Sequence, residues 1–194
     1  GGRGQFAEID LKIEPLEPGH GFEFVSKVVG GSVPKQYIPS VEMGIVDAMS
    51  KGPYAGFPVV DLRVTLTDGK HHEVDSSDFA FRTCARDAIR EAFRQGVPQL
   101  LEPYMSVRVI VSDEYAGGIS GDLCSRRGRI EKIDAAGTRH EIYAMVPLAS
   151  MFGYVTDLRS MTSGRGNFTM HFEHYEAVPY ELAEEIAAQR KNKE

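Results

Sequence analysis

The residues most able to do chemistry stand together in the segment His71-His72-Glu73-Val74-Asp75, which Ser76 and Ser77 follow. Imidazole and carboxylate groups at this spacing could bind a metal ion, and His72 with Asp75 and a serine could form a hydrolytic triad. On a strand, however, adjacent histidines point to opposite faces, so they cannot share one ion without distortion. The serines stand where helix caps are expected, and capping explains them without a nucleophile. We therefore predict neither a metal site nor a hydrolytic site.

Motifs for phosphate binding and redox chemistry are missing as well. No GxxxxGK[ST] occurs, and Gly164-Arg165-Gly166 does not extend to a GxGxxG. Cys84 and Cys124 form neither a CxxC pair nor a disulfide framework, which is typical of a reducing cytoplasm. Cys84 falls within a predicted helix and is expected to be a small buried side chain. We expect no catalytic, cofactor or metal site in this chain.

The composition is that of a globular protein with an acidic total. The 194 residues include 22 Lys+Arg against 28 Asp+Glu, a net charge of −6, with 42% hydrophobic and 26% charged residues. These values exclude a disordered or fibrous chain and disfavour general affinity for polyanions. No apolar run approaches the ~18 residues of a membrane-spanning helix, and no secretory leader is recognisable, so we expect a cytoplasmic protein.

Basic residues nevertheless gather in loops that contain glycine. Residues 25–37 include Lys27 and Lys35 without any acid, and Gly30-Gly31 would let a ligand approach the backbone closely. Residues 68–72 would place Lys70, His71 and His72 at a hairpin, where they could meet nucleic acid. Further basic residues in the second half are Arg126, Arg127, Arg129, Lys132, Arg159 and Arg165. The residues alone leave two alternatives open, RNA binding and ordinary solvated turns.

Hydrophobic patterning predicts an α+β layer in the first hundred residues. Residues 6–13, 22–29 and 60–66 alternate as strands do, and a hairpin at Asp68-Gly69 would return as a strand over 70–74. Helices are predicted over 39–51 and 78–95, the second capped within Asp75–Ser77 and closed by Gly96. The residues available for its buried stripe are Phe79, Ala85, Ala88, Ile89, Ala92 and Phe93.

The second half predicts a β-α-β-β-α-β order, the ferredoxin-like arrangement. Strands are expected over 104–111, 129–134, 139–146 and 167–175, with helices over 114–127, ended by Gly128, and over 148–163. A last helix is predicted over 181–193, after the β-α-β-β-α-β order of this unit is already complete. We therefore predict that it docks on residues 1–100, with Leu182, Ile186 and Ala187 facing inward.

Ordered motifs along the whole chain resemble the fourth and fifth domains of bacterial elongation factor G. In the first half they are Gly1–Phe6, Pro15–Gly19, Gly30–Pro39, Gly56–Asp61 and His72–Ser77. In the second half they are Leu101–Pro103, Gly121–Leu123, Arg126–Gly128, Val146–Leu148, Met151–Tyr154, Asp157–Ser160 and Gly164–Gly166. Because so many motifs occur in order, the chain is identified as a member of this family.

The resemblance implies the C-terminal portion of a translational GTPase. Residues 1–100 would form a ribosomal-protein-like fourth domain with an unusual left-handed βαβ crossover, and residues 101–179 a ferredoxin-like fifth domain. The helix over 180–194 would return to the first domain. GTP with Mg²⁺ would bind to a G domain outside this chain. The parent protein, expected to be a monomer, would use GTP to translocate tRNA and mRNA and would assist ribosome recycling.

The resemblance also implies where the ribosome is contacted. Two tip loops of the fourth domain would enter the small-subunit decoding region and lie against the tRNA–mRNA duplex, with the tip histidine of the family at His72. The matching residues are Gly30, Gly31, Ser32, Val33, Pro34, Lys35, Gln36, Lys70, His71 and His72. The fifth domain would contact large-subunit rRNA near the GTPase-associated centre, and the candidates are Arg126, Arg127, Arg159 and Arg165.

Two departures from the family pattern leave alternatives open. Lys70-His71 stands where many relatives carry Ser-Tyr, and Ser32-Val33 where Val-Ile is common, which could mark a specialised paralogue. A tetracycline-type ribosomal protection factor is disfavoured by the matches at Gly30-Gly31, Pro34 and His72. A stand-alone RNA-binding protein of the ribosomal type is the alternative from a different class. A hydrolase using histidine, aspartate and serine is the weakest alternative.

Overall fold

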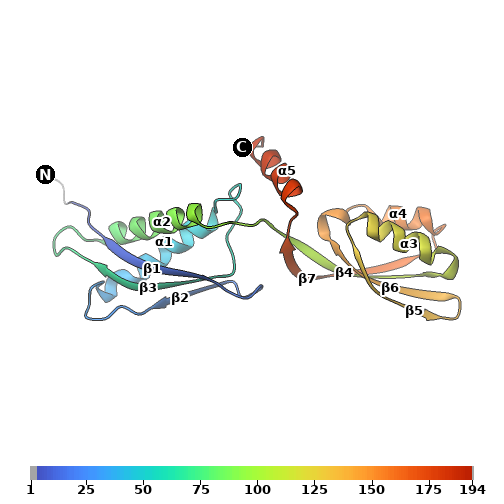
Figure 1. Cartoon of the computed structure of the whole chain (residues 1–194), viewed down its shortest axis with the longest axis horizontal. Helices are drawn as coiled ribbons and strands as arrows, with labels where there is room; N and C mark the ends of the chain where they lie inside the picture. The colour runs from blue at the N-terminus through green and yellow to red at the C-terminus, as the bar shows by residue number, and fades with distance from the viewer. Residues whose placement is uncertain (1–3, 194) are drawn as a thin grey trace. The chain divides into compact units, whose positions relative to one another are not determined.

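The computed structural model describes residues 4–193, so the motif residues Gly1–Arg3 and the final Glu194 lie outside it. The chain forms two compact α+β units (Figure 1). Unit 1 comprises the residues up to Leu100 together with those from Pro179 onward, and unit 2 comprises Leu101–Val178. Among residues 4–193, no helix is both long and apolar enough to cross a membrane.

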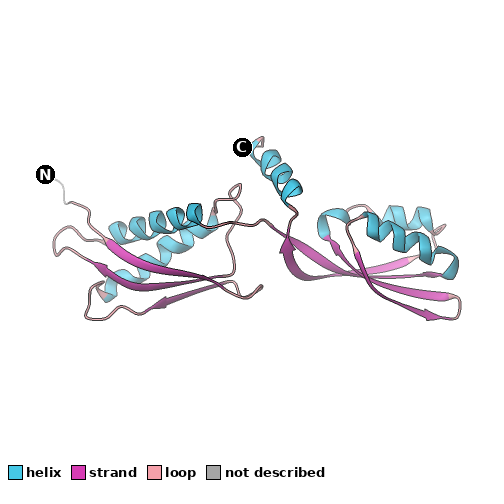
Figure 2. Ribbon diagram, viewed as in Figure 1, coloured by secondary structure: helices cyan, strands magenta, loops and turns pink. Residues whose placement is uncertain are grey.

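Unit 1 is a three-stranded sheet with two helices against one face (Figure 2). The strands β1 (Glu8–Pro15), β2 (Phe22–Ser26) and β3 (Leu62–Lys70) lie in the order β1-β3-β2. β1 is antiparallel and β2 is parallel to β3. Because the parallel pair is joined through η1 (Lys35–Tyr37) and α1 (Ile38–Ser50), it forms a βαβ unit. The left-handedness of this crossover stays a prediction.

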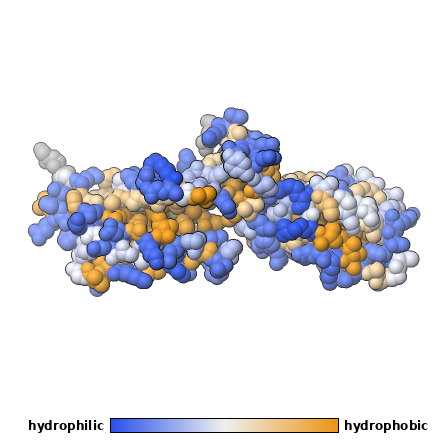
Figure 3. Space-filling view, viewed as in Figure 1, coloured by the Kyte–Doolittle hydropathy of each residue, from blue (hydrophilic) through white to orange (hydrophobic). Residues whose placement is uncertain are grey.

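The core of unit 1 lies between the sheet and its helices α1 and α2 (Asp78–Gln95). Alternation along β3 and the 3.6-residue period of the helices bring apolar side chains to this layer. Those with 0% exposure include Val64, Leu66, Ile45, Phe81 and Ile89. The helices pack closely at Gly44, where an added Cβ would collide with the backbone of Arg82. On the face of unit 1 seen in Figure 3, hydrophilic residues lie around a band of apolar residues.

The predicted hairpin at Asp68-Gly69 is wrong, because β3 runs through both residues to Lys70. Gly69 pairs with Ile9 of β1 in the ladder, and no strand covers residues 70–74 beyond Lys70. A Cβ on Gly69 would lie 2.6 Å from Cγ2 of Val33 and closer still to a carbonyl oxygen of β1. Glycine is needed at this position for close packing, whereas the sequence pattern indicated a turn.

The predicted start of α2 is confirmed, but one member of its predicted buried stripe is wrong. The Ser77 hydroxyl accepts a hydrogen bond from the Ala80 amide at 3.0 Å and caps the helix. Phe79, placed in the stripe from the sequence, is 62% exposed, whereas Phe81 is fully buried. The cap sets the rotational phase of the helix, so that residues 81, 85 and 89, spaced four apart, face the core.

Unit 2 has the predicted ferredoxin-like order. The strands are β4 (Leu101–Ser112), β5 (Arg129–Ala136), β6 (Arg139–Pro147) and β7 (Asn167–Ala177). They pair antiparallel in the order β5-β6-β4-β7, with β4 and β6 in the centre. The helices α3 (Asp113–Ser125) and α4 (Tyr154–Met161) lie on the same face of this sheet (Figure 1).

Two helix ends in unit 2 differ from the prediction. The expected helix over 148–163 is divided into η2 (Leu148–Ser150) and α4, because Gly153 adopts a left-handed φ of 79°. At the end of α3 the left-handed residue is Arg127, with a φ of 61°, and Gly128 follows it. Gly128 donates to the Leu123 carbonyl at 2.9 Å, in the pattern of a Schellman motif.

Helix α3 contains three glycines that its packing does not require. Gly117, Gly118 and Gly121 are exposed, and an added Cβ at each would meet nothing within 4 Å in the described part of the chain. Glycine inside a helix costs about 1 kcal/mol relative to alanine. We therefore expect Gly118→Ala to raise the free energy of unfolding by about 0.5–1 kcal/mol, measured by urea titration. The matched control is Gly128→Ala, where the added Cβ would lie 2.5 Å from the Leu123 oxygen; it should destabilise, and equal effects would contradict the prediction.

The outer face of the unit 2 sheet carries an ion pair that makes stability depend on pH. Arg108 lies 2.7 Å from Glu141 and the Tyr143 hydroxyl donates to the same carboxylate at 2.9 Å. The hydrogen bond from Arg108, and after it the one from Tyr143, lowers the pKa of Glu141 below its usual 4.5. A carboxylate with a lowered pKa contributes stability above its unfolded pKa and loses it as the pH falls through the folded value.

We therefore expect the stability advantage of the native chain over Glu141→Gln to shrink as the pH falls below 4.5. Melting temperatures of both chains between pH 7 and pH 3 measure this, with Glu173→Gln on β7 as the exposed control. An advantage that stays constant with pH would contradict the cause assigned to the pKa of Glu141.

The terminal helix α5 (Tyr180–Lys191) contacts residues that follow α1 in unit 1. The Tyr54 hydroxyl donates to Glu184 at 3.0 Å, and the Arg190 guanidinium lies 3.9 Å from the centre of the Phe57 ring. Ala183, rather than the predicted Leu182, Ile186 and Ala187, is the most buried residue of the helix, at 3% exposure, and those three are half-buried.

Candidate nucleic-acid interface

The first predicted tip loop, between β2 and α1, is exposed at its glycines and anchored by a buried valine. Gly30 and Gly31 have left-handed φ angles of 67° and 72°, which other residues rarely adopt. Val33 is only 1% exposed and belongs to the unit 1 core. Lys35 and Gln36 are exposed on η1, while Ser32 and Pro34 are half-buried. The loop therefore presents backbone at its glycines and polar side chains at η1.

The second predicted tip loop, between β3 and α2, begins at the end of the strand rather than at a hairpin. Lys70 is the last residue of β3, and its ammonium group lies 2.9 Å from Glu8. This contact raises the pKa of Lys70. His71 and His72 lie beyond the strand, so the prediction that they point to opposite faces of a strand is wrong. Among residues 4–193, no three His, Cys, Asp or Glu side chains could hold a metal ion.

The ring of His72 orders the turn in which it lies. Its Nδ1 atom is 3.2 Å from the amide nitrogens of both Val74 and Asp75. Since a backbone N–H can only donate, Nδ1 accepts, and the proton of the neutral ring resides on Nε2. The His72 amide donates to the Ser76 hydroxyl oxygen at 2.9 Å, which fastens the turn a second time. The side chain is still 54% exposed, so it is available to a partner.

The two loops meet at one end of the unit 1 sheet. Nδ1 of His71 lies 3.1 Å from the Ser32 carbonyl oxygen, and Val33 packs against Gly69. The nearby Ser32 side chain and Gly69 amide lower the pKa of Asp68, although the Ser32 hydroxyl makes no hydrogen bond within the described residues. The structure thus brings together the residues that the sequence placed in two separate loops.

A third segment joins this end of the sheet and was missed by the sequence reasoning. The Gly4 amide donates to the Asp75 carboxylate at 3.0 Å, and the Phe6 amide donates to the Asp75 carbonyl at 2.9 Å. The Ser76 hydroxyl in turn donates to the Phe6 carbonyl at 2.8 Å, and the Phe6 ring lies edge-on to His72. The sequence signals for this segment are the family motif Gly1–Phe6 and, within it, Gly4, where an added Cβ would lie 2.9 Å from the Asp75 carboxyl carbon.

Two of the four arginine candidates in unit 2 are used inside the fold. Arg126 is 15% exposed, and its guanidinium contacts Asp122 at 2.9 Å, the Ser150 carbonyl at 2.8 Å and Asp157 at 2.5 Å. Its charge also lies 4.9 Å from the centre of the Tyr154 ring. This network joins α3, η2 and α4, and every guanidinium nitrogen of Arg126 has a partner within it.

Arg127 is held equally firmly by a single acid. Both of its terminal nitrogens contact the two carboxylate oxygens of Glu102, at 2.7 and 2.8 Å, in a bidentate pair. This contact raises the pKa of Arg127. The Glu102 side chain is only 8% exposed, compared with 33% for Arg127. The pair joins the end of α3 to the beginning of β4.

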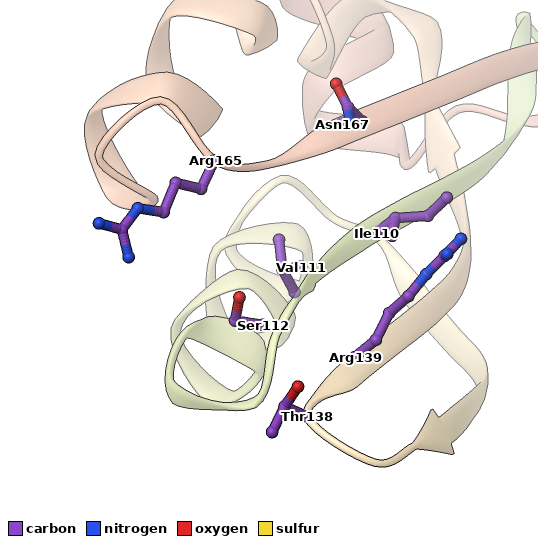
Figure 4. A pocket seen from close by; sticks show the side chains of 7 residues that line it. All are labelled: Ile110, Val111, Ser112, Thr138, Arg139, Arg165 and Asn167. Carbon is purple, nitrogen blue, oxygen red and sulfur yellow. The ribbon is translucent and has the colours of Figure 1, made fainter.

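Arg159 and Arg165 are the exposed arginine candidates. Arg165 borders a hollow of about 330 Å³ that is lined by Ile110, Val111, Ser112, Thr138, Arg139, Arg165 and Asn167. The side chains of Arg139 and Arg165 point away from each other (Figure 4). The hollow therefore does not gather the two positive charges on one anion, and Arg139 contacts Glu141 at 3.2 Å.

Comparison with known families agrees with this two-unit architecture. Residues 1–97 match the family described as elongation factor G, domain IV, and residues 99–186 match the elongation factor G C-terminus. The chain belongs to the elongation factor G family. The boundary between the two matches falls next to the boundary between unit 1 and unit 2.

Individual members of the elongation factor G family are similar over nearly the whole chain. The chain is 56% identical to elongation factor G of Cereibacter sphaeroides over 186 residues, covering 96% of this chain and 26% of that protein. The elongation factor G of a Jannaschia species is 55% identical, covering 97% of this chain and 27% of that protein. The chain therefore spans about a quarter of the length of these relatives.

A solved structure shows the same fold. A crystal structure of a protein from Thermus thermophilus matches with a TM-score of 0.89 and 37% sequence identity. The match covers 99% of this chain and 29% of the Thermus chain. The two-domain α+β fold expected of the elongation factor G family is thereby confirmed, while the roles assigned to the tip residues stay predictions.

Proposed function

We propose that this chain is the ribosome-binding part of an elongation factor G that acts in the cytoplasm. The factor catalyses GTP-dependent translocation of tRNA and mRNA and assists ribosome recycling. The observation that carries the proposal is family membership across both units, at 55–56% identity to factors with this name. The resemblance assigns contact with the decoding region to the end of unit 1 where the two predicted loops meet.

The tip residues suit contact with a nucleic-acid backbone. Gly30 and Gly31 expose backbone that no Cβ shields, and Lys35 supplies a cation beside it. Lys70 is 70% exposed, so a phosphate can replace or share its contact with Glu8. The Nε2–H of His72 is a donor for a phosphate or base oxygen. These groups together favour binding to the tRNA–mRNA duplex in the decoding region of the small subunit.

Unit 2 supplies fewer free cations than the sequence suggested. Because Arg126 and Arg127 are engaged with Asp122, Asp157 and Glu102, they support the fold. We assign contact with large-subunit rRNA near the GTPase-associated centre to the exposed Arg159 and Arg165. Each phosphate contact of this kind makes affinity for RNA depend on salt concentration.

GTP and its Mg²⁺ are proposed to bind to parts of the factor outside this chain, which has no phosphate-binding loop in its sequence. We expect titration of this chain with GTP and Mg²⁺ to give no saturable heat in a calorimeter. The elongation factor G of Cereibacter sphaeroides, titrated under the same conditions, is the positive control. Saturable micromolar binding to this chain alone would contradict the assignment.

A chimeric factor tests the proposed function directly. This chain would replace the domain IV and C-terminal regions of Cereibacter sphaeroides elongation factor G, to which it is 56% identical. We expect the chimera to translocate tRNA and mRNA on ribosomes within a few-fold of the parent rate. Lys35→Glu in the chimera should slow translocation, whereas Lys12→Glu on the sheet should not. A chimera that hydrolyses GTP on ribosomes but supports neither translocation nor recycling would overturn the proposal.

A further inference from the structure

The tip contains two adjacent histidines whose rings are bound in opposite ways. Nδ1 of His71 faces the Ser32 carbonyl oxygen at 3.1 Å, and a carbonyl can only accept, so this Nδ1 carries a proton. Nδ1 of His72 lies 3.2 Å from two backbone amide nitrogens, which can only donate, and 3.5 Å from Oδ2 of Asp75. Because the two amides are nearer than the carboxylate, this Nδ1 is bare in the neutral ring. In their neutral forms the two rings therefore hold opposite tautomers.

The hydrogen bond between His71 and Ser32 restrains the β2–α1 loop directly after its two glycines, the residues with the most backbone freedom. Gly30 and Gly31 precede Ser32, both are left-handed, and a Cβ added to either would meet no described atom within 4 Å. Adjacent glycines have more backbone freedom than any other residue pair. The next fixed point is Val33, which is buried against Gly69. The His71–Ser32 bond thus restrains the loop immediately after its most flexible residues.

We propose that His71 is a positioning residue that holds the β2–α1 loop against the β3–α2 loop, so that the glycines and Lys35 form one surface with His72. This role rests on the proposed function for its consequence on the ribosome, but its structural part stands on the described contacts alone. His72, by contrast, uses Nδ1 within its own turn and keeps Nε2–H for a partner. His71 therefore orders the surface, and His72 contacts the ligand.

The opposite tautomers of His71 and His72 predict different ring-nitrogen signals for the two residues in this chain. Nitrogen NMR at pH 8 distinguishes protonated from bare ring nitrogens. We expect the protonated nitrogen to be Nδ1 in His71 and Nε2 in His72. His20, whose Nδ1 lies 3.0 Å from the Glu17 carbonyl oxygen in a different loop, provides a reference for a ring that donates through Nδ1. The same tautomer in His71 and His72 would overturn the proposal.

Amide exchange measures whether the bond positions the loop. Loss of one hydrogen bond of this kind corresponds to about a 3- to 10-fold shift in a local equilibrium. We expect His71→Ala to speed exchange by about this factor at Tyr37, whose amide donates to the Pro34 carbonyl of the β2–α1 loop at 2.9 Å. His71→Asn should restore protection, because an asparagine Nδ2–H has the same place along the side chain as Nδ1–H of histidine. His20→Ala is the matched control and should leave exchange at the Tyr37 amide unchanged.

Ribosome binding then measures the consequence. Because a loosened loop must be ordered upon binding, we expect His71→Ala to weaken the affinity of this chain for ribosomes by about the same 3- to 10-fold, with recovery in His71→Asn. Unchanged exchange in His71→Ala, or faster exchange with unchanged affinity, would overturn the positioning role. A native chain that does not bind ribosomes would contradict the proposed function, whereas the exchange and tautomer results would still decide the role of His71.

Discussion

Arg127→Met is expected to lower the free energy of unfolding of unit 2 by about 3 kcal/mol. The substitution removes the bidentate partner of Glu102, whose side chain is 8% exposed, and leaves a buried carboxylate without a counter-ion. Breaking such a pair costs more than the pair itself contributes, since the remaining charge stays desolvated. Urea unfolding followed by circular dichroism measures the loss.

Two further variants separate the charge effect from backbone strain. Arg127 has a φ of 61°, and glycine relieves about 1 kcal/mol at such a position, so Arg127→Gly should lose about 2 kcal/mol. The double variant Glu102→Leu with Arg127→Met leaves no unpaired charge and should recover more than half of the loss. Arg159→Met, at an exposed position, is the control and should change stability by less than about 0.5 kcal/mol. A loss below about 1 kcal/mol in Arg127→Met would contradict this account.

His72→Asn in the chimeric factor is expected to slow translocation by about 10- to 100-fold while leaving ribosome-stimulated GTP hydrolysis nearly unchanged. A hydrogen bond from Nε2–H to a charged phosphate is worth about 1.5–3 kcal/mol, which sets this range. Asparagine is preferred to alanine because its Oδ1 can accept from the amides two and three residues on, as Nδ1 of His72 does. The turn is thereby kept while the outer donor is lost.

The comparison with His72→Ala assigns the effect to the ligand or to the turn. Alanine removes both the outer donor and the acceptor for the Val74 and Asp75 amides, so it should add a stability loss of about 0.5–1.5 kcal/mol. Its translocation rate should match that of His72→Asn if the Nε2 donor is what matters. Normal translocation in His72→Asn together with slow translocation in His72→Ala would show that His72 serves only the turn.

Much of the fold could be predicted from local pattern. The alternation in β1 and β3, the Ser77 cap of α2 and the β-α-β-β-α-β order of unit 2 all come from interactions within short segments. The prediction failed at Asp68-Gly69, because a glycine there is compatible both with a hairpin turn and with close packing inside a strand. Asp68-Gly69 has the composition of a hairpin turn, but its glycine is needed because Val33 and β1 approach the strand there.

The candidate site, like the fold, was predicted from the sequence only in part. Sequence alone placed Gly30–Gln36 in a loop with basic residues and Lys70–His72 at a hairpin, on its returning strand, and the resemblance assigned both to the tip of the family's fourth domain. Asp122 lies four residues before Arg126 on the predicted helix, so this pair could be expected from sequence. Sequence could not show the contacts of Arg126 with Asp157 and of Arg127 with Glu102, because these partners are brought near only by folding. Nor could it show that residues 4–6 lie beside the turn that contains His72.

The sequence by itself determined the two units, the family and the order of elements apart from the strand predicted over 70–74, because periodicity, caps and ordered motifs are local features of the chain. Only the tertiary structure decided which side chains are free. His71 and His72 are adjacent and chemically identical, yet one donates to Ser32 and the other accepts from its own turn. The physical reason is that a hydrogen bond depends on the atom opposite the ring. For His71 that atom is supplied by a residue 39 positions away in the chain, whereas for His72 it is supplied by the turn itself.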